Sequence, residues 1–157
     1  PVEGMGIARR IAHLTYRTES EMDVRFGRQL QGDDTGRYAV ESYLDHQASK
    51  LAKRFDANTY IALTDAMNTW DVGRGRGGVE RALRSLEVPL LVAGIDTDRL
   101  YPIHLQEQIA ELAGNTVTGL RIIKSDFGHD GFLIEHDEVF ALVEEILDLA
   151  QTHLTAG

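Results

Sequence analysis

The sequence contains no cysteine, which excludes a disulfide framework and any metal site built on thiolates. It also lacks an apolar run near the roughly 20 residues of a membrane-spanning helix, since the longest lies around Val88–Ile95. The N-terminus has no charged stretch followed by an apolar segment, so no signal peptide is visible. We therefore expect a cytoplasmic protein that does not enter the membrane.

Basic residues are the minority among the charges, with 16 Lys and Arg against 25 Asp and Glu and a net charge of −9. This balance argues against binding a nucleic-acid backbone, which needs clustered Lys and Arg. The 43% of hydrophobic residues and 26% of charged residues are ordinary for one globular domain. The sequence begins at Pro1 rather than Met, so we expect the numbering to begin inside a longer protein or after processing.

The first half of the chain predicts helices. The apolar residues Ile7, Ile11 and Leu14 recur at helical spacing and predict a helix from about Gly4 to Arg17. A short helix is expected to open near Ser20, and two longer helices are expected over residues 38–55 and 57–70. The glycine-rich segment 71–78 interrupts the pattern, so we expect a helical subdomain over residues 1–78.

The second half alternates strands with helices. The run Val88–Ile95 is continuously apolar and ends at Asp96, which is typical of a strand buried on both faces. A helix over 103–112, a strand over 120–125 and a closing helix over 139–149 follow. This alternation predicts an α/β fold with a parallel sheet over residues 79–157.

A polar segment follows each predicted strand: Asp96-Thr97-Asp98 after the first, and the residues 128–132 (GHDGF) after the second. Ligands of open α/β sheets bind outside the carboxyl ends of the strands, where an aspartate of one loop can hold the imidazole of His129 in one tautomer. The order Asp then His is that of α/β-hydrolases, in which the serine comes earlier. The alternative, that both segments are merely turns, stays open.

The sequence lacks a nucleophile that could complete a Ser-Asp-His triad. No serine lies in a Gly-x-Ser-x-Gly elbow, and there is no cysteine to replace it. The five serines are Ser20, Ser42, Ser49, Ser85 and Ser125.

The glycines Gly73, Gly75 and Gly78 have the spacing of a dinucleotide-binding loop, but such a loop must follow a strand and here a helix precedes it. The simplest interpretation is a flexible basic turn. The alternative is that Arg74 and Arg76, next to a helix N-terminus, attract the phosphates of a carrier such as coenzyme A.

The first helix carries a polar face, because Arg9, His13 and Tyr16 are spaced i, i+4, i+7 and lie opposite the apolar residues. Spacing alone favours a solvated face, and the alternative is that this face lines a cleft. The other histidines show no metal-ligand spacing, so we expect no metal site. They are His46, His104, His136 and His153.

Five segments together resemble motifs of the homoserine O-acetyltransferases, in that family's order and in an actinobacterial style. They are residues 8–17 (ARRIAHLTYR), 37–44 (RYAVESYL), 71–78 (DVGRGRGG), 98–102 (DRLYP) and 128–132 (GHDGF). The resemblance implies the C-terminal part of an α/β-hydrolase fold. Residues 1–78 would form a helical lid and dimerisation subdomain, and residues 79–157 the last βα units of a mostly parallel sheet.

The resemblance also implies a ping-pong reaction of methionine biosynthesis, in which a serine takes acetyl from acetyl-CoA and passes it to L-homoserine. Acetyl-CoA would be a co-substrate, with no cofactor bound. Asp98 rather than Asp96 matches the acid of the triad, and His129 matches the base. Three further positions match those that hold homoserine: Arg9, Tyr16 and Asp130.

The family's nucleophile motif lies upstream of anything present here, so we expect this chain alone to be inactive without the N-terminal part of the same enzyme. A homodimer through the helical lid is also implied. Two alternatives stay open: a homoserine O-succinyltransferase or esterase of the same fold, and a non-catalytic module that a partner completes.

Overall fold

The computed structural model describes residues 1–33, 35–114 and 117–155. The chain divides into two compact units, Pro1–Trp70 and Asp71–Gly157. The glycine-rich segment 71–78 therefore belongs to the second unit, whereas the sequence predicts a helical subdomain that extends to residue 78.

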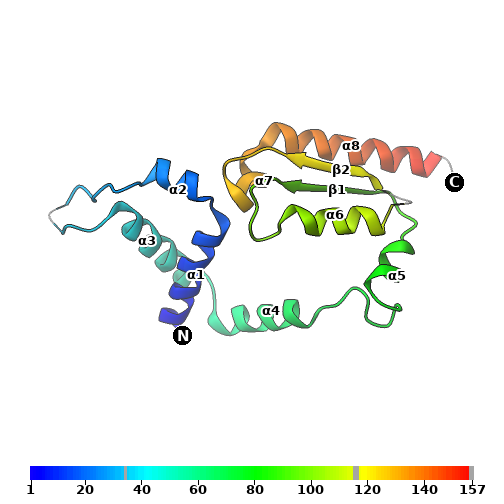
Figure 1. Ribbon diagram of the computed structural model, residues 1–157. Helices are drawn as coiled ribbons and strands as arrows, with labels where there is room; N and C mark the ends of the chain where they lie inside the picture. Colours follow the sequence, from blue (N-terminus) through cyan, green and yellow to red (C-terminus); the bar gives the residue numbers. More distant parts are fainter. Residues whose placement is uncertain (34, 115–116, 156–157) are drawn as a thin grey trace. The chain divides into compact units, whose positions relative to one another are not determined.

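The first unit is helical, and its helices fall where the apolar periodicity predicts them. They are α1 (Val2–Tyr16), α2 (Glu19–Arg25), α3 (Ala39–Arg54) and α4 (Ala57–Thr69) (Figure 1). Side chains cap two of them, because Thr18 Oγ1 accepts the Glu21 N–H at 3.1 Å and Asp56 Oδ2 accepts the Thr59 N–H at 2.8 Å. Such caps satisfy N–H groups that have no partner within the helix.

Helices α1 and α3 pack against each other through small residues and through the polar side of α1. Ala48 of α3 is buried beside Gly6, and His13 of α1 is only 6% exposed. The apolar residues of α1, by contrast, are exposed within this unit: Ile7, Ile11 and Leu14. The interpretation of the polar side as a solvated face is therefore wrong for His13, because this side chain packs against α3.

The second unit is a two-stranded parallel sheet flanked by helices. Its elements are α5 (Val79–Arg84), β1 (Leu90–Ile95), α6 (Ile103–Leu112), β2 (Val117–Ile123), the 3₁₀ turn η1 (Gly128–Asp130), α7 (Gly131–Ile134) and α8 (His136–Thr155). Ile95 pairs with Ile123 at the carboxyl ends of the strands. The strands lie between α6 and α8 (Figure 1), and Val92, Ile95 and Ile123 are buried. The predicted α/β arrangement with a parallel sheet is confirmed.

Over the described residues, no helix is both long enough and apolar enough to span a membrane. The same residues contain no group of three or more His, Cys, Asp or Glu side chains that could hold a metal ion.

Candidate active site

The two strands of the sheet end at one edge, and each continues into a polar loop. The Asp96 N–H donates to the Ile123 carbonyl at 3.1 Å, which carries the strand pairing one residue into the loops. Residues 96–98 and 124–130 are therefore brought side by side from segments that lie about 30 residues apart in the sequence. This is the edge at which ligands of parallel α/β sheets bind.

Asp98 and His129 meet at this edge. His129 Nδ1 lies 2.8 Å from Asp98 Oδ2, and the side chains are 20% and 7% exposed respectively. Because a carboxylate only accepts hydrogen bonds, Nδ1 carries the proton and Nε2 is the basic nitrogen of the ring. The structure thus brings His129 together with Asp98, the aspartate that the motif resemblance selects, and their part in catalysis stays a prediction.

The Asp98 carboxylate is fixed on its other side by backbone. Its Oδ1 accepts the N–H groups of Leu100 at 2.8 Å and Tyr101 at 2.9 Å. The His129 ring lies between two aromatic rings, with centroid distances of 5.3 Å to Tyr101 and 5.4 Å to Phe132. These contacts restrict the imidazole to one orientation toward the carboxylate.

Asp96 has a different set of partners. Its Oδ1 accepts the Ser125 N–H at 3.0 Å, and its Oδ2 lies 3.1 Å from Lys124 Nζ. The Ser125 hydrogen bond, with the nearby Lys124 ammonium, lowers the pKa of Asp96 below its ordinary value. Asp96 therefore acts as a brace between the loops, while Asp98 faces the histidine.

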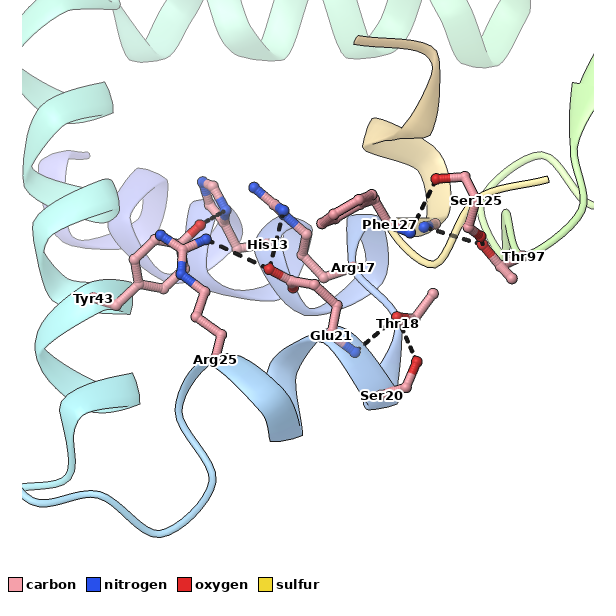
Figure 2. Close-up of polar contacts among 11 residues, drawn as sticks. His13, Arg17, Thr18, Ser20, Glu21, Arg25, Tyr43, Thr97, Ser125 and Phe127 are labelled. Carbon is pink, nitrogen blue, oxygen red and sulfur yellow. Dashed lines mark hydrogen bonds and ion pairs between the residues drawn. The ribbon is translucent and has the colours of Figure 1, made fainter. Parts of the chain in front are cut away.

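Two hydroxyl groups, which the sequence does not mark as functional, join the same loops. Thr97 Oγ1 donates to the Ser125 carbonyl at 2.6 Å and accepts the Gly128 N–H at 3.1 Å, and Ser125 Oγ accepts the Phe127 N–H at 3.1 Å (Figure 2). Space is tight around Ser125, because a Cβ on Gly131 would lie 2.8 Å from Ser125 Oγ. The only signal in the sequence is the occurrence of Thr and Ser in loops that follow strands.

A mostly apolar cavity of about 300 Å³ lies beside the pair. Asp98 and His129 line it together with Gln106 of α6 and Leu142 of α8.

Arg9 and Tyr16 lie together on α1 in the first unit. The Arg9 guanidinium carbon is 6.0 Å from the centre of the Tyr16 ring, and both side chains line a cavity of about 130 Å³ with Phe55 and Tyr60. Asp130, in the second unit, directly follows His129, ends η1 and is the N-cap residue of α7. Because these residues belong to different units, their assembly into one site stays a prediction.

A buried polar cluster in the first unit was not expected from the sequence. Tyr43 Oη and His13 Nδ1 are hydrogen-bonded at 3.0 Å, and Glu21 Oε1 lies 3.3 Å from Arg17 and 3.6 Å from Arg25 (Figure 2). The Glu21 side chain is only 9% exposed. The i, i+4 spacing of the two arginines about Glu21 signals the ion pairs, but not their burial.

The segment that carries Arg74 and Arg76 forms a turn, as its glycines predict. Gly75, Gly77 and Gly78 have φ angles of 72°, 84° and 95°, a region that favours glycine. The segment follows helix α4 rather than a strand, which is unlike a dinucleotide-binding loop. Binding of coenzyme A phosphates by the two arginines stays a prediction.

Comparison with known proteins identifies relatives of this chain, although no family model matches it. The chain is 54% identical over 155 residues to the homoserine O-acetyltransferase of Mycobacterium sp. (strain KMS), and 56% identical to that of Mycolicibacterium smegmatis. The chain is related to the homoserine O-acetyltransferases. The match covers 96% of this chain but 41% of the first of these relatives, so the chain spans about two fifths of their length.

Solved structures give the fold. A homoserine O-acetyltransferase from Bacillus anthracis superposes with a TM-score of 0.80 at 19% identity, over 94% of this chain and 41% of that one. Esterase E22 superposes with a TM-score of 0.75 at 19% identity, over 96% of this chain and 42% of the esterase. The expected C-terminal part of an α/β-hydrolase fold is thereby confirmed.

Proposed function

We propose that this chain is the C-terminal part of an enzyme that transfers an acetyl group from acetyl-CoA to L-homoserine, a step of methionine biosynthesis. The observation that carries the proposal is the 2.8 Å contact between His129 Nδ1 and Asp98 Oδ2 at the carboxyl edge of the parallel strands. It is supported by the 52–56% identity to homoserine O-acetyltransferases.

In this mechanism His129 moves a proton twice. Its Nε2 takes the proton of a serine hydroxyl, the serine oxygen attacks the thioester carbonyl, and the coenzyme A thiolate leaves with that proton. Nε2 then takes the proton of the homoserine hydroxyl, whose oxygen attacks the acyl-serine, and returns this proton to the serine as it leaves. Asp98 holds the required tautomer and stabilises the imidazolium that forms in each step.

The serine comes from outside these 157 residues, since none of the five serines here lies in a nucleophile elbow. The chain thus supplies two members of the triad and needs the N-terminal part of the same enzyme for the third. We expect the isolated chain to release no thiol from acetyl-CoA at an enzymatic rate. No bound cofactor enters the mechanism.

A site that binds homoserine needs a cation for the carboxylate of the substrate and an anion for its ammonium group. Arg9 is permanently charged and can bind the carboxylate through two parallel hydrogen bonds. Asp130 adjoins His129, so its carboxylate can meet the ammonium group while the hydroxyl points at the imidazole. Tyr16, near Arg9 on the same helix face, adds a hydrogen bond to the substrate.

The test of this acceptor site separates the two half-reactions in the complete protein. Arg9→Ala and Asp130→Ala should slow transfer to homoserine and spare the burst of serine acylation by acetyl-CoA. Arg54→Ala, at an exposed position near the end of α3, is the control and should leave both steps unchanged. Unchanged homoserine kinetics in the first two variants would remove Arg9 and Asp130 from the site.

The donor and acceptor are tested by following free thiol release from acetyl-CoA by the complete protein. We expect release that depends on homoserine. Release at the same rate without homoserine would instead indicate an esterase-like hydrolase, and preference for succinyl-CoA would indicate a succinyltransferase. No release under any of these conditions would favour the non-catalytic module.

We also propose that a second copy of the protein covers α4. The structure describes no buried residue in this helix, and one of its faces is an exposed apolar stripe. The stripe consists of Tyr60, Leu63, Met67 and, at the end of the helix, Trp70. Residues at this spacing lie on one side of a helix, and a continuous apolar surface of this kind favours an interface.

A further inference from the structure

Thr97 lies between the two aspartates of the loop after β1, and its hydroxyl reaches the loop after β2 at two points. It donates to the Ser125 carbonyl at 2.6 Å and accepts the Gly128 N–H at 3.1 Å. A hydroxyl group has one hydrogen to donate and lone pairs to accept, so one side chain can make both bonds at once. The two points lie on either side of residues 126 and 127.

The second of these points is the residue that leads into His129. Gly128 is buried, has a φ of 64° and begins the 3₁₀ turn that carries the histidine. This positive φ is a region that favours glycine. Because glycine has no side chain, the conformation of Gly128 depends on the hydrogen bonds of its backbone. A shift of the Gly128 amide therefore moves the His129 ring relative to Asp98.

We propose that Thr97 is a positioning residue for the acid–base pair, which rests on the proposed function of Asp98 and His129. Thr97 holds the backbone in front of His129, and Asp98, the next residue, holds the imidazole. The hydrogen bond of Thr97 to Gly128 and that of Asp98 to His129 come from adjacent residues of one loop. The distance from Asp98 Oδ2 to His129 Nδ1 therefore depends on the Thr97 hydroxyl. Thr97 touches no reacting atom in this scheme and acts through the orientation of the ring.

The other braces of the loop act farther from the histidine. Asp96 Oδ1 binds the Ser125 N–H, and Ser125 Oγ binds the Phe127 N–H. Both bonds fix the start of the loop, whereas the Gly128 N–H is the last backbone donor before His129. Loss of the Thr97 hydroxyl is therefore expected to disturb the pair more directly than loss of either of these groups.

The test uses four variants of the complete protein, assayed by homoserine-dependent thiol release. Thr97→Val removes the hydroxyl and keeps the shape, Thr97→Ala removes hydroxyl and methyl, and Thr97→Ser keeps the hydroxyl. Thr64→Val is the matched control, because this hydroxyl donates to the Tyr60 carbonyl within α4, away from the loops of the site. Misplacement of a reacting group by about 1 Å costs on the order of 100-fold in rate.

We expect Val and Ala at position 97 to lower kcat about 10- to 100-fold with little change in KM for homoserine, while Thr97→Ser and Thr64→Val stay near the unchanged protein. Equal losses in the Ser and Ala variants would overturn the proposal, because these two differ only in the hydroxyl. The Ser–Ala comparison also decides the question should Thr97→Val fail to fold.

Two further readouts separate positioning from a general loss of structure. The NMR resonance of the His129 Nδ1 proton should shift or broaden in Thr97→Ala and stay in place in Thr97→Ser and Thr64→Val. In an Asp98→Asn background Thr97→Ala should cost much less activity than in the unchanged protein, because it acts through the same pair. An unshifted resonance, or additive losses, would contradict the proposal. The NMR readout needs no turnover, so it distinguishes this failure from an error in the proposed reaction.

Discussion

Two aspartates that are separated by a single residue have different roles at the edge of the sheet. Asp98 binds the His129 imidazole and two backbone N–H groups, and Asp96 binds the Ser125 N–H and Lys124. The sequence could place both aspartates at the end of a strand. The choice of Asp98 came from motif resemblance, because spacing alone cannot tell which carboxylate faces the histidine.

The lowered pKa of Asp96 gives a prediction about stability and pH. The folded state holds this carboxylate ionised at lower pH than the unfolded state does, so the unfolded state binds the proton more readily. The contribution of Asp96 to the free energy of unfolding is therefore complete above about pH 4 and is lost as the pH falls through the lowered pKa of the folded state. Asp96→Asn should remove this part of the acid sensitivity.

Urea unfolding of the complete protein at about pH 6 and about pH 3 measures the effect. The unchanged protein should lose more stability between these two values than Asp96→Asn does. Asp148→Asn, on the exposed side of α8, should behave like the unchanged protein. Identical losses in the protein with and without Asp96 would show that this carboxylate does not contribute.

At the scale of elements, apolar periodicity located the long helices but not their ends or their partners. Helix α8 begins at His136, before the predicted start at Val139, because Asp137 and Glu138 are polar residues that suit a helix N-terminus. Strand β2 begins at Val117, three residues before the predicted start at residue 120, because Gly119 interrupts the run of apolar residues. The turn η1 and helix α7 were not predicted, because the glycines at 128 and 131 indicate a tight turn. The helical conformation of η1 is stabilised by contacts with the neighbouring loop, such as the Gly128 N–H bond to Thr97, which the sequence does not show.

The packing of α1 could not be predicted from the residue types. Its apolar side is exposed in the first unit and its histidine is buried against α3. Binary patterning assumes that an apolar face meets the core of the same unit, and this assumption fails when that face belongs to a contact with another part of a larger protein. Such a contact is our expectation for Ile7, Ile11 and Leu14.

The hydrogen bond between Tyr43 and His13 gives a prediction about the α1–α3 contact. Tyr43→Phe keeps the aromatic ring, which packs edge-on to His13 at a centroid distance of 5.4 Å, but removes the hydroxyl that is hydrogen-bonded to His13 Nδ1. We expect a loss of about 1–3 kcal/mol in the free energy of unfolding, because His13 is buried. Urea unfolding measures it, and Ser49→Ala at an exposed position of α3 should cost at most about 0.5 kcal/mol. A Tyr43→Phe variant as stable as this control would show that the hydrogen bond does not contribute to the stability of the protein.

At the scale of the whole molecule, many large apolar side chains among the described residues are exposed. The exposed residues Phe140, Val143 and Leu147 follow helical spacing along α8, and α4 carries the stripe described above. Parallel sheets normally have both faces covered within larger sheets, and this one has two strands. These features agree with a chain that spans about two fifths of the length of its relatives.

The stripe on α4 gives a prediction about assembly. The complete protein should be a dimer at micromolar concentration, and Met67→Glu should shift it toward the monomer, because a charge would have to be buried in an apolar interface. Asn58→Glu, on the opposite side of α4, should leave the dimer unchanged. Sedimentation velocity measures both variants. A monomeric unchanged protein, or a dimer that tolerates Met67→Glu, would place the interface elsewhere or remove it.

Asp98 and His129 are the residues that we propose as the acid–base pair of acetyl transfer to homoserine. The most direct measurement is the rate of homoserine-dependent thiol release from acetyl-CoA by the complete protein with Asp98→Asn, beside Asp96→Asn at the neighbouring carboxylate. We expect Asp98→Asn to remain folded but to lose roughly 10⁴-fold in kcat, by analogy with serine-protease triads, while Asp96→Asn loses far less. Equal losses in the two variants, or near-normal turnover with Asp98→Asn, would contradict this proposal.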